Sequence, residues 1–70
     1  MVELDARGLF CPEPLMMAKA AMDAHPADTI CILVDTAPPR DNIVRLASRT
    51  GWTSDVVERA DGDIAITLSK

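Results

Sequence analysis

The sequence predicts an α+β fold, a two-layer α/β sandwich with the element order β-α-β-α-β-β, in which a four-stranded mixed sheet has both helices on one face. Three observations predict it. Apolar residues alternate or cluster over segments of strand length, and they recur at helical spacing over two longer segments. The dipeptide Asp61-Gly62 is a strong hairpin signal between the last two strands. The 70 residues suffice for a single domain that spans 1–70.

The first half of the chain predicts a strand, a helix and a second strand. Residues 2–6 alternate between apolar and polar side chains, which is typical of a short half-buried strand ending at Gly8. From Pro12 the apolar side chains recur at helical spacing until Pro26 ends the run. Residues 29–35 form a compact apolar run rich in β-branched side chains, which predicts a central strand covered on both sides.

The second half predicts a helix and a closing hairpin. Pro38 and Pro39 are tolerable in the first turn of this helix or just before it, and Gly51 is expected to end it as a left-handed cap. Segments 52–58 and 63–68 are the expected hairpin strands. Because crossovers between parallel strands are right-handed, both helices should cover the same sheet face. The other face would be barer, which invites a partner or a dimer.

The composition excludes several classes of protein. With 49% hydrophobic and 26% charged residues the chain is globular rather than disordered, and no apolar run approaches the ~20 residues of a membrane span. A net charge of −4 and scarce aromatic residues disfavour direct contact with nucleic acid. The start, MVELDARG, lacks the basic and apolar regions of a signal peptide. We therefore expect a cytoplasmic protein that does not bind membranes.

The two cysteines are expected to differ in role. Cys11 stands in GLFCPEPLMM, residues 8–17, between an apolar triplet and two prolines that flank Glu13. Cys31 stands in the middle of an apolar strand, where a packing role is expected. These cysteines and His25 are too few and too irregularly spaced for a structural zinc site, and no C-x-x-C pair occurs. Neither a metal nor another cofactor is expected.

The surroundings of Cys11 favour a reactive thiol. If Pro12 is the first helical residue, Cys11 is the cap, and the positive end of the helix dipole lowers the pKa of its thiol. Pro14 removes a second donor from the first turn, so the N–H groups of Glu13 and Leu15 can point toward the sulfur. The alternative is a small buried hydrophobe, since free cysteine is among the most buried residue types.

Several other side chains are candidates for contacts near this thiol. Helical periodicity places Met16 opposite the apolar side of its helix, where it is either a docking contact or an ordinary surface residue. Three cations, Arg7, Lys19 and Arg40, can lie near the Cys11 end, with plain surface charge as the alternative reading.

The segment LDARGLFCPEPLMMAKAAM, residues 4–22, resembles the signature of the TusA-like (SirA-like) sulfur-carrier family. Members of this family share L-D-x-x-G-L-x-C-P-x-P, followed by a helix that contains Lys or Arg. The resemblance extends over essentially the whole chain and implies the same fold. Family members often have an Arg-Asp pair at the start of the second helix, which here is Arg40-Asp41. The TAPP segment, residues 36–39, departs from the family, so contacts of that loop need not transfer.

The resemblance implies a function for Cys11. It would accept sulfane sulfur as a persulfide from a donor protein of the cysteine desulfurase or rhodanese type, and hand it to an acceptor protein. Such relays serve tRNA thiolation, cofactor maturation or sulfur oxidation, and the carrier is a sulfurtransferase without a full catalytic cycle. The residues expected to frame the site are Asp5, Gly8, Pro12, Glu13 and Pro14, and those expected to contact it or a partner are Arg7, Met16, Lys19, Arg40 and Asp41.

Two alternatives to a sulfur carrier stay open. Cys11 can belong to a thiol-based redox or regulatory protein, in which it is oxidised or paired between chains. It can also be inert, in a plain interaction module that uses the bare sheet face. For the sulfur carrier we expect a monomer or weak dimer.

Overall fold

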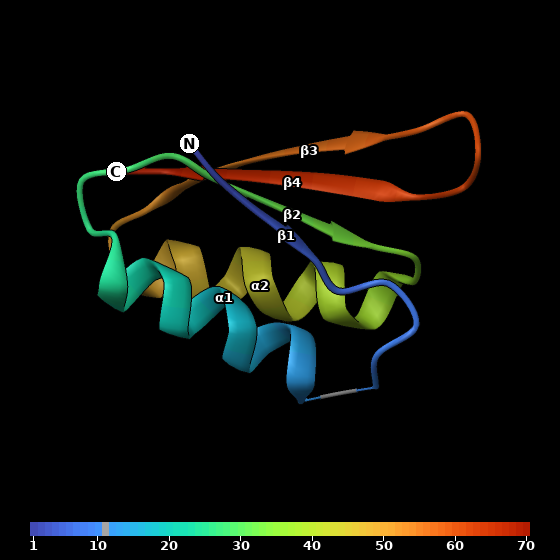
Figure 1. Cartoon of the computed structure of the whole chain (residues 1–70), viewed down its shortest axis with the longest axis horizontal. Coiled ribbons are helices and arrows are strands. Elements are labelled where there is room, and N and C mark those ends of the chain that lie inside the picture. Colours follow the sequence, from blue (N-terminus) through green and yellow to red (C-terminus); the bar gives the residue numbers. More distant parts are fainter. Residues whose placement is uncertain (11) are drawn as a thin grey trace.

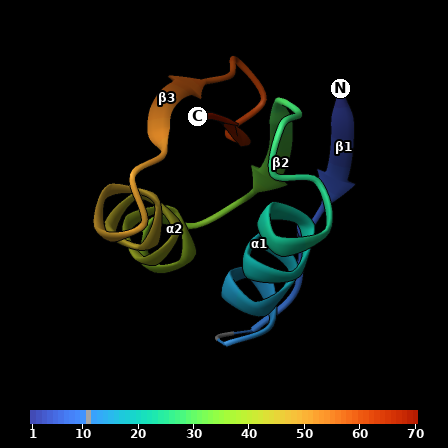
Figure 2. The same cartoon turned by 90° about the vertical axis from the view of Figure 1, so that its left-hand side faces the viewer.

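The computed structural model describes residues 1–10 and 12–70. Along the chain the elements are β1 (Val2–Asp5), α1 (Glu13–Ala24), β2 (Ile30–Val34), α2 (Ala37–Arg49), β3 (Thr53–Glu58) and β4 (Ile64–Ser69). Both helices lie on the same side of the sheet (Figure 1) and run next to each other beneath it (Figure 2). The predicted two-layer α+β fold is therefore confirmed.

The four strands form one mixed sheet in the order β1-β2-β4-β3. Strand β1 is parallel to β2, whereas β4 is antiparallel to both β2 and β3. The register places Leu4, Ile32 and Ile66 side by side across the sheet. Strand β2 is central, as predicted, and the strands at the two edges are β1 and β3.

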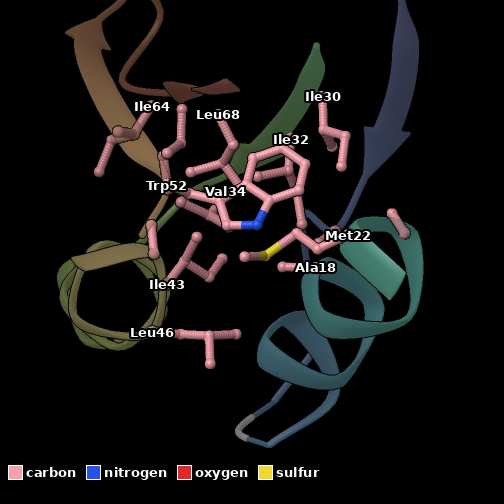
Figure 3. Close-up of a cluster of buried hydrophobic side chains, with 14 residues drawn as sticks. Ala18, Met22, Ile30, Ile32, Val34, Ile43, Leu46, Trp52, Ile64 and Leu68 are labelled. Carbon is pink, nitrogen blue, oxygen red and sulfur yellow. The ribbon is translucent and has the colours of Figure 1, made fainter. Parts of the chain in front are cut away.

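The core lies between the sheet and the helices, as Figure 3 shows. Strands β2 and β4 alternate between buried and half-buried residues, so every second side chain of each strand faces the helices. Most of these side chains are β-branched, which suits a packed strand surface. The buried residues drawn and labelled in this layer are Ala18, Met22, Ile30, Ile32, Val34, Ile43, Leu46, Trp52, Ile64 and Leu68.

The opposite sheet face has no helix over it, and we call it the uncovered face. Cys31 and Leu33 of the central strand are only half-buried there, so the expectation of a strand covered on both sides is wrong. Cys31 is a free thiol outside the buried core. A shallow hollow of about 320 Å³ on this face is lined by Glu3, Leu4, Asp5, Cys31, Leu33, Arg59 and Ala65.

Helix α2 begins and ends as the sequence predicts. Thr36 is its N-cap, and both prolines of the TAPP segment lie in its first turn. At the other end Gly51 has φ +83°, the left-handed conformation expected of it. The N–H of Trp52 then donates to the carbonyl oxygen of Ala47 at 2.8 Å, which satisfies one of the last helical carbonyl groups.

The chain closes with the predicted hairpin between β3 and β4. The N–H of Gly62 donates to the carbonyl oxygen of Arg59 at 3.1 Å, and the N–H of Arg59 donates to that of Asp63 at 2.7 Å. Gly62 has φ +92°, which this tight turn requires. Within the part of the chain that the structure describes, neither helix has the length and apolar character needed to cross a bilayer.

Candidate functional site

The amino end of α1 begins at Glu13, and Pro12 is its N-cap. Pro12 has φ −99° and ψ 17°, outside helical values, and its carbonyl oxygen accepts a bond from the N–H of Met16 at 3.0 Å. The prediction that Pro12 is the first helical residue, with Cys11 as the cap, is therefore wrong. The physical reason is a turn before the helix, closed by the N–H of Glu13 on the carbonyl oxygen of Phe10 at 2.9 Å.

This turn also changes which backbone N–H groups at the start of α1 are free to donate. The N–H of Glu13 donates to the carbonyl oxygen of Phe10, so it is not the free donor that we expected. Pro14 lies buried in the first turn and has no N–H to offer. The start of α1 is therefore poor in donors, and the side chain of Glu13 adds a negative charge there.

Cys11 itself lies outside the described residues, so its exposure and its pKa stay predictions. In the sequence it stands directly before the N-cap of α1 and directly after Phe10. The residues on either side of it belong to the connection between β1 and α1, residues 6–12, which we call the β1–α1 loop. The geometry of this loop is what the structure contributes to the site.

A bidentate ion pair between Asp5 and Arg7 lies at the start of the β1–α1 loop. Nε and Nη2 of Arg7 each donate to a different carboxylate oxygen of Asp5 at 2.9 Å, and the Arg7 backbone N–H donates to Oδ1 at 3.1 Å. These hydrogen bonds lower the pKa of Asp5 to about 2, while Asp5 and Asp63 raise the pKa of Arg7. The two side chains are 44% and 56% exposed, so water weakens their attraction and the pair mainly orders the loop.

Two carboxylates from other loops hold the same segment. Nη1 of Arg7 donates to Oδ2 of Asp63 at 2.8 Å, and the backbone N–H of Gly8 donates to Oδ2 of Asp35 at 3.0 Å. Asp35 follows β2 and Asp63 precedes β4. Both therefore lie at the end of the sheet where β1 finishes. In Figure 1 the three connections lie on the right-hand side of the molecule. Gly8 has φ +77°, which favours glycine at this position.

These carboxylates accept hydrogen bonds from nitrogen donors of the loop. Within residues 1–10 and 12–70, no group of three or more His, Cys, Asp or Glu side chains is arranged to hold a metal ion. The cluster therefore gives no sign of a metal centre in the described part of the chain.

Arg40 and Lys19 lie apart from the β1–α1 loop. Arg40 pairs with Asp41 at 3.1 Å and with Glu58 at 3.5 Å, beside the edge strand β3 rather than the edge strand β1. Lys19 is exposed and pairs with Asp23 at 3.7 Å, toward the carboxyl end of α1. Of the three cations expected near the Cys11 end, Arg7 is the one that lies in the loop itself.

Two exposed apolar side chains flank the position of Cys11 along the chain. Met16 is 62% exposed on the first turns of α1, which confirms its predicted exposure. Phe10 is 84% exposed, although it belongs to an apolar triplet that also fits a packing role. Its neighbour Leu9 is half-buried and packs against the core. Exposed apolar side chains beside a candidate site are candidates for partner contacts.

Sequence reasoning missed Phe10, Asp35 and Asp63 as residues of this site. The signals present are weak: a lone phenylalanine next to the cysteine, and aspartates that directly follow or precede strands. Arg7 and Asp63 are 56 positions apart, and no periodicity links them. Their pairing becomes visible only once the sheet topology brings the two loops together.

Comparisons with known proteins match this chain over almost its whole length. The family model described as sulfurtransferase TusA matches residues 2–70. A protein of Methanocaldococcus jannaschii that is named as a candidate sulfur carrier is 28% identical over 71 aligned positions, which cover 100% of this chain and 95% of the relative. The crystal structure of a SirA-like protein from Desulfitobacterium hafniense superimposes with a TM-score of 0.92 at 33% identity. That match covers 97% of this chain and 95% of the other.

Proposed function

The chain belongs to the TusA sulfurtransferase family, and we propose that it carries sulfane sulfur as a persulfide on Cys11. The observation that supports this proposal most is the position of the family match, which spans the Cys-Pro-Glu-Pro segment, residues 11–14, and the loop before it. The structure adds a donor-poor start of α1 directly after that cysteine. Asp5, Gly8, Pro12, Glu13 and Pro14 frame the site in this proposal.

The proposed transfer is an exchange between two sulfur atoms. The Cys11 thiolate attacks the outer sulfur of a persulfide on the donor protein and forms a new S–S bond. The donor's own S–S bond breaks, and its electron pair leaves with the inner sulfur as a thiolate. The outer sulfur keeps its hydrogen and is now part of a persulfide on Cys11. Charge and electrons balance, so no external oxidant or reductant is needed.

A helix start with few free N–H donors suits a carrier better than a strong anion site. Two or three N–H groups aimed at the sulfur would stabilise the thiolate and lower its nucleophilicity together with its pKa. In this chain one first-turn N–H is engaged by Phe10, and Pro14 supplies none. The dipole of α1 then favours ionisation without binding the sulfur tightly, so the cargo can leave again.

Sulfur carriers act between a donor and an acceptor protein. We propose a cysteine desulfurase or rhodanese-type donor, which meets the chain through Phe10 and Met16, since both are exposed next to the site. The acceptor protein would serve tRNA thiolation, cofactor maturation or sulfur oxidation, and the surface of that protein would determine which of them this chain supplies. A single domain acting in the cytoplasm as a monomer or weak dimer fits this role, because a free thiol needs a reducing compartment.

Mass spectrometry of the intact protein tests the proposal. The chain is incubated with a cysteine desulfurase and cysteine, and we expect one added sulfur atom that a reductant removes. Cys11→Ser should take up none, whereas Cys31→Ser, the matched control, should load like the wild type. No addition to the wild type, or an addition that survives Cys11→Ser, contradicts the proposal.

A further inference from the structure

We propose that Asp63, in the loop between β3 and β4, is a positioning residue for sulfur transfer because it holds the β1–α1 loop through Arg7. The inference rests on the proposed function and extends it to a residue 56 positions away from Arg7. It makes the hairpin loop part of the sulfur-transfer site.

The backbone of Asp63 is held in place by two hydrogen bonds. Its backbone N–H donates to Oδ1 of Asp61 at 3.1 Å, and its carbonyl oxygen accepts from Arg59 at 2.7 Å. Its side chain is 16% exposed, against 56% for that of Asp5. The Arg7–Asp63 contact is therefore more shielded from water and salt than the Arg7–Asp5 contact.

The Arg7–Asp63 contact also links the β1–α1 loop to the β3–β4 loop, which is far from it in the sequence. Asp5 is two residues from Arg7, so their pair orders the chain only locally. Asp63 ties the same guanidinium to the start of β4, which is an inner strand of the sheet. The Gly8 N–H bond to Asp35 adds a second tether at the next residue. The loop is thus held at two successive residues before Cys11.

Arg7 acts on the loop rather than as a charge reserved for the sulfur. Its Nε, Nη1 and Nη2 groups all donate to carboxylate oxygens. Removing Arg7 would leave Asp5, Asp35 and Asp63 together and unneutralised beside the loop, which mixes a geometric effect with a charge effect. Changing Asp63 also removes a charge, but it leaves the bidentate Arg7–Asp5 pair in place, and the alkylation rate of the thiol reports any effect of that charge.

Transfer from a protein donor demands more of the loop than reaction with a small reagent. An alkylating agent needs only an ionised and accessible thiol. Transfer within a docked complex needs the two sulfur atoms aligned, and small misplacements of reacting groups slow such steps strongly. A loosened loop should therefore slow transfer while changing alkylation little, whereas general damage to the fold should affect both.

The experiment compares desulfurase-dependent loading with iodoacetamide alkylation of Cys11. Asp63→Ala should slow the maximal loading rate about 5- to 10-fold and change the alkylation rate less than about twofold. Asp63→Glu, which keeps a carboxylate, should restore most of the loading rate. The control is Asp28→Ala, which removes an exposed carboxylate, the partner of His25 at 3.8 Å, at the opposite end of the sheet. Unchanged loading in Asp63→Ala, or an equal fall in both rates, overturns the inference.

Amide hydrogen exchange separates this inference from the proposed function. Asp63→Ala should speed exchange at residues 7–10 and leave residues 25–28 unchanged, whether or not sulfur is present. Unchanged exchange at residues 7–10 in a chain that loads sulfur overturns the role of Asp63 alone. A wild-type chain that takes up no sulfur overturns the proposed function, and the positioning role with it.

Discussion

The carbonyl oxygen of Phe10 accepts a hydrogen bond from the N–H of Glu13 at 2.9 Å, which ties together the residues on either side of Cys11 and Pro12. The same turn delays the start of α1 to Glu13. Phe10 is left 84% exposed and Met16, a few residues further on, is 62% exposed. The chain on either side of the cysteine thus carries exposed apolar side chains that the core does not use.

Replacing Phe10 should therefore impair docking without impairing stability. Phe10→Ser should change the free energy of unfolding by no more than about 0.5 kcal/mol, since the ring buries little surface. It should raise the donor concentration needed for half-maximal loading about 3- to 10-fold, with the maximal rate unchanged. Leu9→Ser is the matched control, because Leu9 packs against the core and its loss should lower stability. If Phe10→Ser reaches half-maximal loading at the same donor concentration as the wild type, the ring does not contact the donor protein.

Cys31→Ser tests whether the second thiol takes part. Cys31 is half-buried on the uncovered face, where a serine hydroxyl can reach water. We expect the free energy of unfolding to change by less than about 1 kcal/mol and the loading of one sulfur atom to persist. Urea unfolding and intact mass measure the two quantities. Loss of loading in this variant would mean that the relay needs both thiols.

Much of the fold is predictable because its signals are local. The alternation in β4, the helical spacing in α1 and the cap at Gly51 each depend on residues within a few positions of one another. The strand order β1-β2-β4-β3 is different, because it depends on which strand edges meet in three dimensions. The half-exposure of Cys31 also depends on the three-dimensional arrangement, because both helices cover the same face of the sheet. In the sequence, an apolar strand that is covered on one face looks the same as a strand that is buried on both faces.

The site was less predictable than the fold. The position of Cys11 before a helix could be inferred from Pro12 and Pro14, yet the helix boundary was misplaced. A proline is equally compatible with the N-cap and with the first helical turn, and the Phe10–Glu13 bond decides between them. The partners of Arg7 and Gly8 come from other loops, so their identity follows from topology and not from spacing.

The Asp5–Arg7 pair predicts a loss of stability in acid. The hydrogen bonds from Arg7 lower the pKa of Asp5 from 3.8 to about 2 on folding, so the folded state favours the carboxylate. The stabilisation is present above pH 3.8 and is lost as the pH falls through about 2. Asp5→Asn should be less stable than the wild type at pH 5, and the two should converge near pH 2 in urea titrations. Because both side chains are about half exposed, added salt should shrink the difference. A constant difference across this range would contradict the assignment.

Gly51→Ala tests the end of α2 far from the cysteine. Gly51 has φ +83°, and a Cβ built there meets no atom within 4 Å, so the cost is backbone strain and not a clash. We expect a loss of about 1–2 kcal/mol in the free energy of unfolding, with a smaller loss for Gly51→Asn, which tolerates this conformation better. Fluorescence of the buried Trp52 follows unfolding in urea. Ser48→Ala, at an exposed position of the same helix, is the control and should be neutral or slightly stabilising. Sulfur loading should be unchanged at temperatures where both variants are folded, and a loss of loading by Gly51→Ala would show that this end of the fold communicates with the site.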